Sequence, residues 1–444
     1  MTPGARTDLR IAAVFCGISG VYHALYVIFM LSGGPRIGPA LDVLFPDYLV
    51  FDAAVRAFFA GKLAIVYDID AFTQYQSVLF ADRFGGTVLF RPFLYPPIWL
   101  LMVLPLGLLS VGAAYAVFII VTAAAATLLE GRRDPWGWLA VITSPAAVWV
   151  VLAGQNTFLS VALFYGGLRL LDRSPIAAGI LLGLLAYKPQ IWVLVPLALL
   201  AARQWQALAW TIGTVAALSL ASLGVFGLDF WLSFLDAARE AGSPQVAETM
   251  FRRIYMHMTT LLAAGRILGL SSAAAGVLQL AGAVLVVAAV WFAFRRPAAS
   301  TDARIAVLAT ATFLVSPYTL NYDLLLLMPA AVAMFRRGAA EGFHPGERVL
   351  YLFLWLIPTL GMVLNRLDLP VMPLLILLFG MVAWSRLPDV AKVELPGGKA
   401  ARENARTSGD KGNTGGEPWP IPTNRFSSSA TPAAGSTTPK PRTT

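Results

Sequence analysis

The acidic residue best placed for chemistry in this sequence is Asp47. It follows Pro46 and opens a stretch, 47–60, in which apolar residues recur at helix-like spacing. A carboxylate there could take part in a reaction, or it could cap the helix, because the N-terminal end of a helix dipole favours an anion. Asp52, about one turn further on, could form an acid–base or metal pair with it, with solvated loop charge as the alternative. The same alternatives apply to two later carboxylates of this loop, Asp68 and Asp70.

Lys188 is a more specific candidate, because it lies between two apolar arms in the turn Tyr187-Lys188-Pro189-Gln190. A lysine at membrane depth costs several kcal/mol unless it pairs with an anion or extends to the interface. The phosphate of a substrate is the natural partner for such a cation. Extension of the side chain to the membrane surface is the alternative. Gln190, in the same turn, is a candidate for substrate binding.

Further polar residues lie where apolar runs end. The amides of Gln155 and Asn156, which follow Gly154, could donate hydrogen bonds to a sugar hydroxyl or cap a helix. Asn321 and Asp323 could likewise cap a helix or line a site. In a later loop, 227–272, the candidates could bind a phosphate or a sugar ring, with a solvated surface as the alternative. The substrate-binding candidates at the ends of apolar runs and in this loop are Tyr95, Gln155, Asn156, Arg253, His257, Tyr318, Asn321 and Asp323.

The composition predicts an all-α polytopic membrane protein. Of the 444 residues, 58% are hydrophobic and 13% are charged, and the mean hydropathy is +0.70. A helix needs about 20 apolar residues to cross a bilayer, and the apolar runs of this chain predict about 11–13 crossings. Helices are expected because unpaired backbone groups cannot face lipid. Clear examples of such runs are 11–32, which we interpret as a retained first helix, 207–226 and 273–294.

Several classes of protein are disfavoured. The single cysteine, Cys16, excludes a disulfide framework and a thiolate metal site. The sequence contains no phosphate-binding glycine loop, no Cys/His metal spacing and no nucleophile elbow, which argues against nucleotide hydrolysis. The formal net charge of +9 is carried largely by short loops and by the C-terminal tail, so we expect no nucleic acid partner.

The distribution of arginine predicts the topology. Arg6 and Arg10 precede the first run, so the positive-inside rule places the N-terminus in the cytoplasm and the long loop 33–91 outside. We expect the helix at 47–60 to lie at the membrane interface with one apolar face. In the stretch 92–129 we expect one partial segment and one true crossing, because two crossings would place Arg132 and its neighbour Arg133 outside.

The later runs alternate between arginine-bearing loops and polar clusters, which places every polar cluster on the non-cytoplasmic side. The predicted segments are 136–152, 157–171, 175–187, 191–202, 207–226, 273–294, 303–316, 324–335, 348–364 and 370–385. Helix-end residues without a shared role would not segregate in this way. We therefore predict a membrane domain over 1–386 with a catalytic surface on its outer side. Residues 387–444 are rich in Gly, Pro, Ser and Thr and are expected to form a disordered cytoplasmic tail.

The order of these clusters resembles that of the family-87 glycosyltransferases, which are GT-C-type integral membrane enzymes. The resemblance covers roughly residues 8 to 385 and rests on five motifs in order. They are Asp47-Tyr48 followed by Val50-Phe51, Tyr95-Pro96-Pro97, Gly154-Gln155-Asn156, Tyr187-Lys188-Pro189-Gln190, and Ser316-Pro317-Tyr318 with Asp323.

The resemblance implies a GT-C-type bundle that transfers a hexose, with inversion, from a polyprenyl-phosphate sugar to a lipid or glycan acceptor. Mannose is the family's best-known donor sugar, and the transfer would occur at the periplasmic face of a bacterial inner membrane. Asp47 matches the family's catalytic aspartate and would act as the general base. Lys188 would stabilise charge on the leaving phosphate, and His257 corresponds loosely to a functional histidine. We assign no cofactor and no metal ligands, and the sequence leaves open whether a divalent metal is needed, since the loop carboxylates match no defined metal-binding loop.

Two other functions account for part of the pattern. A transporter or flippase of lipid-linked sugars would also bury polar groups between helices. The sequence shows no inverted repeat, however, and its polar clusters do not reach the middle of the membrane. A ligase or polymerase of surface polysaccharide would also need long outer loops and cationic sites.

Overall fold

A computed structural model describes residues 10, 12–21, 46–81, 91–296 and 299–388. The chain divides into two units, Met1–Val390 and Ala391–Thr444, and only the first contains described residues. Most of the predicted first span lies outside the described residues, and so does the predicted disordered tail from residue 389 onward. A short apolar helix is described at Ala12–Val21.

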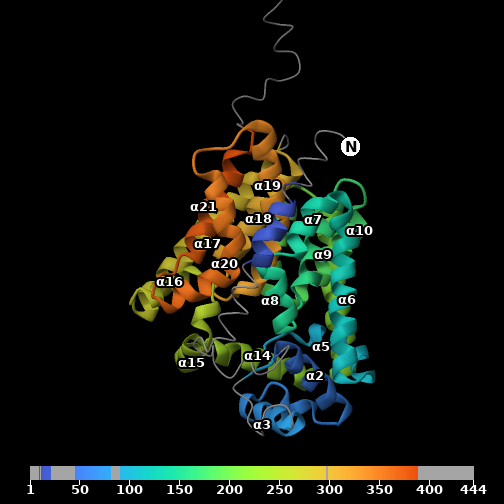
Figure 1. Ribbon diagram of the computed structural model, residues 1–444. Coiled ribbons are helices and arrows are strands. Elements are labelled where there is room, and N and C mark those ends of the chain that lie inside the picture. Colours follow the sequence, from blue (N-terminus) through green and yellow to red (C-terminus); the bar gives the residue numbers. More distant parts are fainter. Residues whose placement is uncertain (1–9, 11, 22–45, 82–90, 297–298, 389–444) are drawn as a thin grey trace, which may run out of the picture. The chain divides into compact units, whose positions relative to one another are not determined.

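The described part of the chain consists of α-helices and short 3₁₀ segments (η) joined by loops (Figure 1). It contains no strand, and Met258 and Leu320 form an isolated antiparallel bridge. The prediction of an all-α chain is confirmed. The elements of its first half are α2 (Pro46–Phe59), η2 (Leu63–Ile65), α3 (Ile69–Leu79), α5 (Pro97–Val103), η3 (Leu104–Leu108), α6 (Val111–Leu129), η4 (Gly131–Arg133), α7 (Pro135–Ile142), α8 (Pro145–Ala153), α9 (Thr157–Leu170), α10 (Pro175–Leu184), η5 (Leu185–Tyr187), α11 (Pro189–Trp192), α12 (Val195–Ala201) and α13 (Trp205–Phe226).

The second half ends in two apolar helices, α20 and α21, that pack on each other. Its elements are α14 (Leu228–Ala241), α15 (Pro244–Ile254), η6 (Tyr255–His257), α16 (Leu261–Ile267), α17 (Ser272–Arg295), α18 (Thr301–Val315), η7 (Asn321–Leu327), α19 (Met328–Glu341), α20 (Glu347–Arg366) and α21 (Met372–Ser385).

Four described helices are long and apolar enough to cross a membrane, namely α6, α13, α17 and α20. A fifth crossing is possible if α7 and α8 form one bent span. This agrees with a polytopic membrane protein, although the count is below the predicted figure of about 11–13 crossings. The difference is one of length, because six further apolar helices are each shorter than 18 residues. The stretch 92–129 forms the short segment α5–η3 and the full-length α6, as the sequence predicts.

The predicted span 136–152 is broken. Helices α7 and α8 meet at an angle of 54°. The Ser144 side chain accepts a hydrogen bond from the backbone N–H of Ala147 and caps α8, and Pro145 follows at the first helical position. Proline has no N–H to donate to the preceding turn, so a continuous helix is disfavoured at this point. After the bend, α8 leads directly into Gln155 and Asn156, which take part in the polar contacts of the candidate site.

Two glycines allow α10 to approach α13 closely. A Cβ atom at Gly179 would lie 2.5 Å from the carbonyl oxygen of Ala207, and one at Gly183 would lie 2.5 Å from Cβ of Thr214. Real Cβ contacts are not this short. Because α10 leads directly into η5 and Lys188, this packing fixes the position of the lysine.

The expectation that α2 has only one apolar, buried face is wrong. Its residues from Tyr48 to Val55 are all buried, including Asp52 at 3% exposure. Asp52 is accommodated there because Arg56 donates to its carboxylate from Nε over 2.6 Å and from Nη2 over 3.2 Å. The Phe51 ring packs edge-on against Tyr95 and Trp99. Helix α2 is therefore part of the core.

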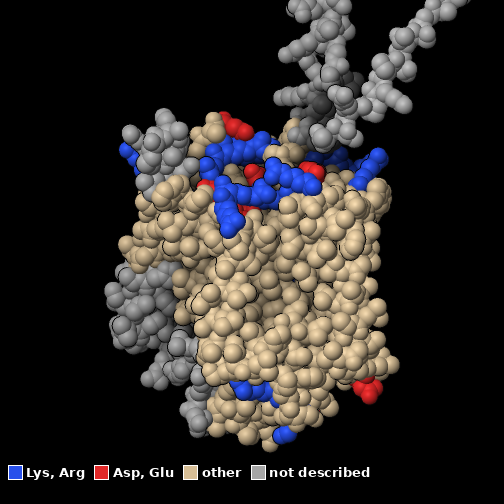
Figure 2. Space-filling model, turned by 90° about the vertical axis from the view of Figure 1, so that its right-hand side faces the viewer, with Lys and Arg blue, Asp and Glu red and all other residues tan. Residues whose placement is uncertain are grey.

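Lysine and arginine gather at one end of the described unit (Figure 2). This is the end at which Figure 1 places α7, α10 and α19, whereas α2, α3 and α14 lie at the opposite end. Between them, the face shown in Figure 2 is a broad band with little charge. The described helices of the first long loop, α2 and α3, thus lie at the end away from this concentration of lysine and arginine.

Candidate active site

A cavity of about 470 Å³ brings together residues from all five sequence clusters and from the second long loop. Asn156 does not line the cavity; it is fully buried and accepts a hydrogen bond from Lys188, which does line it. Arg253 is an exposed residue, and Gln190 and Tyr318 are partly exposed. The candidates that line the cavity are Asp47, Tyr95, Gln155, Lys188, Gln190, Arg253, His257, Tyr318, Asn321 and Asp323.

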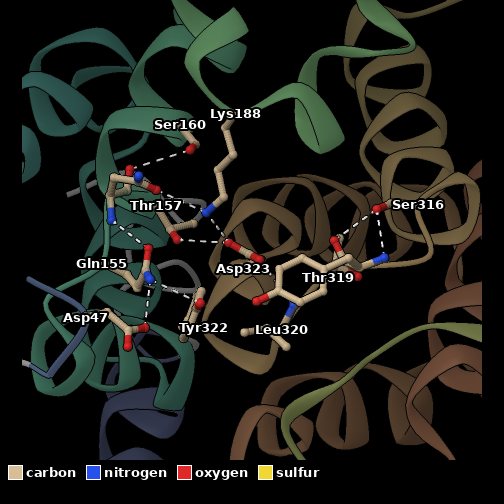
Figure 3. A network of polar contacts seen from close by, with 12 residues as sticks. Asp47, Gln155, Thr157, Ser160, Lys188, Ser316, Thr319, Leu320, Tyr322 and Asp323 are labelled. Atoms are coloured by element: carbon tan, nitrogen blue, oxygen red, sulfur yellow. Dashed lines mark hydrogen bonds and ion pairs between the residues drawn. The ribbon is translucent and has the colours of Figure 1, made fainter. Parts of the chain in front are cut away.

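Asp47 lies in the first turn of α2, and its side chain is 28% exposed. Gln155 Nε2 donates a hydrogen bond of 2.7 Å to Asp47 Oδ2 (Figure 3). Gln155 reaches this position because Gly154 ends α8 in the left-handed region, at φ 73°, which glycine adopts without strain. The Tyr95 hydroxyl donates to Gln155 Oε1 over 3.2 Å, so the orientation of the amide is defined from both sides.

Lys188 lies deeper, at 1% exposure, and pairs with a carboxylate of the protein itself. Its Nζ donates to Asp323 Oδ1 over 2.5 Å and to Asn156 Oδ1 over 3.0 Å (Figure 3). The Thr157 hydroxyl and the backbone N–H of Leu320 also donate to Asp323. The structure therefore supplies the anionic partner that the sequence led us to expect from substrate. The charges of this pair compensate each other at the wall of the cavity.

Arg91 is a cavity residue that was not among the sequence candidates. Its Nη1 lies 3.3 Å from Asp47 Oδ1, and its side chain is 15% exposed. Burial lowers the pKa of Arg91 below its ordinary value, and the charge of Asp47 opposes this shift. The positive-inside rule contains a signal that could have found it, because an arginine in a loop that the rule predicts to lie outside calls for a local reason.

Two hydrogen bonds hold the extended segment 91–95, which carries Arg91 and Tyr95. Gln76 of α3, at 1% exposure, donates from Nε2 to the carbonyl oxygen of Arg91 over 2.9 Å. The Tyr67 hydroxyl donates to the carbonyl oxygen of Tyr95 over 2.7 Å. Residues of the first long loop, 33–91, therefore position both side chains at the cavity.

His257 occupies another part of the cavity wall. Its Nδ1 lies 3.2 Å from Asn321 Oδ1, and its ring packs edge-on against Trp149. The amide nitrogen of Asn321 donates to the carbonyl oxygen of Pro358, which leaves Oδ1 to accept from the histidine. Desolvation by burial lowers the pKa of His257 below 6.5, although the bond to Asn321 and the charge of Asp47 oppose the shift. Neutral His257 then carries its proton on Nδ1 and presents Nε2 as an acceptor.

The other carboxylates that the structure describes in the first long loop, those of Asp52, Asp68 and Asp70, do not line the cavity with Asp47. Asp52 pairs with Arg56, and Asp68 caps α3 by accepting from the backbone N–H groups of Asp70 and Ala71. The interpretation of Asp52 as a second acid of the site is therefore wrong. Among the residues that the structure describes, no group of three or more His, Cys, Asp or Glu could hold a metal ion.

The arrangement suits proton transfer from a hydroxyl group. Asp47 offers a carboxylate held by Gln155 and Arg91, and a general base must lie within hydrogen-bonding reach of the proton it removes. The cavity lies beside apolar helices, and its wall carries amides, a histidine and hydroxyl groups that could bind a polar ligand.

The comparisons with known proteins agree with the resemblance noted in the sequence. The family model for glycosyltransferase family 87 matches residues 93–317, which is half of the chain. No curated protein and no solved structure matches. The matched range includes Tyr95, Gln155, Lys188 and His257, and Asp47 lies before it. The chain belongs to glycosyltransferase family 87 and is a membrane glycosyltransferase.

Proposed function

We propose that this glycosyltransferase moves a hexose, with mannose as the first choice, from a polyprenyl-phosphate donor to a hydroxyl group of a lipid or glycan acceptor. The observation that carries the proposal is the position of Asp47. It is an accessible carboxylate held by a hydrogen bond at the wall of a 470 Å³ cavity. The cavity is lined by residues of the first outer loop, which lies at the end opposite the arginine-rich loops.

The transfer is a single displacement with inversion. The acceptor oxygen attacks the anomeric carbon while its proton passes to an Asp47 carboxylate oxygen. The bond between that carbon and the phosphate oxygen breaks, and its electron pair leaves with the polyprenyl phosphate. Gln155 holds the carboxylate through its second oxygen, Oδ2. The products are the glycosylated acceptor and the lipid phosphate, and no oxidant, reductant or nucleotide is required.

The remaining cavity residues bind the substrates in this proposal. The His257 Nε2 atom and the side chains of Gln190, Arg253 and Tyr318 are placed to meet the sugar and acceptor hydroxyls. Lys188, Asp323, Asn156 and Asn321 support the wall through the contacts described above.

The positive-inside rule supports a location in which the arginine-rich end faces the cytoplasm. In a bacterial inner membrane the cavity would then open to the periplasm. The donor would enter from the lipid, because the surrounding helices present apolar side chains outward, among them Ile120, Leu220 and Leu285. A GT-C-type architecture is the corresponding fold assignment.

Transfer from a radiolabelled donor tests this function. Purified protein is incubated with polyprenyl-phosphate-[¹⁴C]mannose and a lipid extract, and the labelled products are separated. We expect a new glycolipid with the wild type, none with Asp47→Asn, and wild-type product with Asp70→Asn. Asp70 is an exposed carboxylate of the same loop that does not line the cavity, so its variant controls for charge and folding.

Two outcomes would contradict the proposal. Near-full turnover by Asp47→Asn would remove Asp47 as the base. Movement of labelled lipid across proteoliposomes without a new glycosidic bond would instead support a transporter. Other polyprenyl-phosphate sugars, offered in parallel, separate a wrong sugar from a wrong reaction.

A further inference from the structure

We propose that Arg91 binds the phosphate of the lipid-linked donor and, in the empty site, serves as the counter-ion of Asp47. The inference rests on the proposed function, because it assigns the leaving-group site of that reaction. The same guanidinium would thus connect the base to the leaving group.

The charge balance of the cavity favours Arg91 for this task. Three cationic side chains line the described cavity, those of Arg91, Lys188 and Arg253. Lys188 is fully buried and lies 2.5 Å from Asp323, so its charge is compensated inside the protein. Arg253 is an exposed residue, at which water weakens any interaction with an anion. Arg91 is 15% exposed and its ion pair with Asp47 is longer, at 3.3 Å, so it is the cation of the three best placed to bind a phosphate.

The contacts of Arg91 leave donors for a second anion. Its Nη1 reaches Asp47 Oδ1 over 3.3 Å, which is long for a charged hydrogen bond. Among the described residues, Asp47 is the one acceptor against the guanidinium. A guanidinium has five N–H donors in a planar fork that matches phosphate oxygens. Arg91 can therefore bind phosphate without first breaking a buried ion pair.

The backbone fixes where the guanidinium can reach. Gln76 holds the carbonyl oxygen of Arg91, and Tyr67 holds that of Tyr95, at the two ends of the segment 91–95. Tyr95 contacts Gln155, which in turn holds Asp47. These contacts connect the base, Asp47, to the phosphate-binding cation, Arg91. The donor's anomeric carbon would therefore be held within reach of an acceptor oxygen bound at Asp47.

Binding of a prenyl phosphate tests the proposal without requiring catalysis. The probes are farnesyl phosphate and farnesol, which share a chain and differ in the phosphate. Binding is measured by isothermal titration calorimetry on the full-length protein in nanodiscs. We expect the wild type to bind farnesyl phosphate more tightly than farnesol. In Arg91→Gln this preference should fall by about tenfold or more, as expected for the loss of a hydrogen bond between charged groups. Arg91→Lys should retain part of it.

Arg252→Gln is the matched control. Arg252 also lies in an outer loop, but its side chain is 77% exposed, pairs with Glu248 and does not line the cavity. This variant should bind both probes as the wild type does. An unchanged phosphate preference in Arg91→Gln would overturn the proposal. An equal loss in Arg91→Gln and Arg252→Gln would also overturn it, because it would show that the preference depends on the overall positive charge and not on Arg91.

The two proposals fail in different ways. If the phosphate preference depends on Arg91 but no sugar is transferred, the reaction is wrong and the anion site stands. If Asp47-dependent transfer occurs and Arg91→Gln binds farnesyl phosphate normally, the reaction stands and the assignment of Arg91 falls.

Discussion

Gln155 and Asp47 lie 108 residues apart in sequence and are joined by a hydrogen bond of 2.7 Å between Gln155 Nε2 and Asp47 Oδ2. The same nitrogen lies 3.1 Å from the Tyr322 hydroxyl, and Gln155 Oε1 accepts from Tyr95. The amide is thus held by two aromatic side chains and in turn orients one oxygen of the carboxylate. The other oxygen, Oδ1, faces Arg91.

Replacement of Gln155 by leucine should lower kcat much more than it changes KM. A hydrogen bond to a charged group contributes about 1.5–3 kcal/mol, which corresponds to a loss of roughly 10- to 100-fold if it acts fully on the transition state. Steady-state kinetics at saturating donor measure the effect. Because Gln155 acts through Asp47, adding Gln155→Leu to Asp47→Asn should produce little further loss. Losses that multiply in the double variant would assign Gln155 an independent role.

The buried pair of Lys188 and Asp323 makes a prediction about stability. Removing one partner of a buried ion pair leaves an uncompensated charge and costs about 3–5 kcal/mol. Lys188→Met should therefore lower the thermal unfolding temperature in detergent strongly. Lys188→Met combined with Asp323→Leu should recover most of the loss, because both charges are then removed. A double variant that is less stable than either single variant would show that hydrogen bonds from Thr157 and Leu320 matter more than charge balance.

Sequence reasoning located the helices well because long apolar runs and flanking arginines are local signals. The predicted runs 207–226 and 273–294 correspond to α13 (Trp205–Phe226) and α17 (Ser272–Arg295). It also found most of the polar residues that line the cavity, since polar groups at the ends of apolar runs are rare and costly. The bend between α7 and α8 was missed, although Ser144 and Pro145 together form a recognisable start of a helix.

Pairing between distant residues could not be predicted. Lys188 and Asp323 are 135 residues apart, and a single sequence does not show that they meet. For the same reason Lys188 was expected to need an anion from substrate. The burial of both faces of α2 was not predicted, because burial of Asp52 depends on its ion pair with Arg56, whose own side chain stays 31% exposed. Arg91 was not predicted, because it belongs to none of the five motifs and a single arginine in a loop carries no recognisable spacing.

His257 predicts how activity and stability change with pH. Its pKa is lowered below 6.5 by burial, so it stays neutral in the folded protein at pH values where the unfolded chain has gained a proton. Its contribution to stability is therefore constant above about pH 6.5 and decreases as the pH falls from there through the lowered pKa. If neutral His257 accepts a substrate hydroxyl, kcat/KM should fall over the lower part of this range. A pH profile of kcat/KM for the wild type and for His257→Gln measures this.

The matched control for this profile is His344→Gln. His344 lies in the loop before α20 and does not line the cavity, so its variant should keep the wild-type profile. In His257→Gln the acidic fall assigned to this histidine should disappear, with a lower plateau. A fall that persists unchanged in His257→Gln would assign it to another group.

Tyr67 tests whether hydrogen bonds hold the segment 91–95, which carries Arg91 and Tyr95. Burial raises the pKa of Tyr67 above its ordinary value, so the hydroxyl keeps its proton and donates to the carbonyl oxygen of Tyr95. Tyr67→Phe removes this bond and retains the ring, which packs against Phe93 and Phe230. Loss of a single hydrogen bond costs about 1 kcal/mol, so the fold should survive. We expect kcat to fall several-fold, because Tyr95 and hence Gln155 lose a fixed position.

Tyr75→Phe is the control, since Tyr75 is a partly buried tyrosine of the same loop that does not line the cavity. Wild type and Tyr67→Phe are prepared and assayed in the same way. Equal kcat values for the two would mean that packing alone holds segment 91–95.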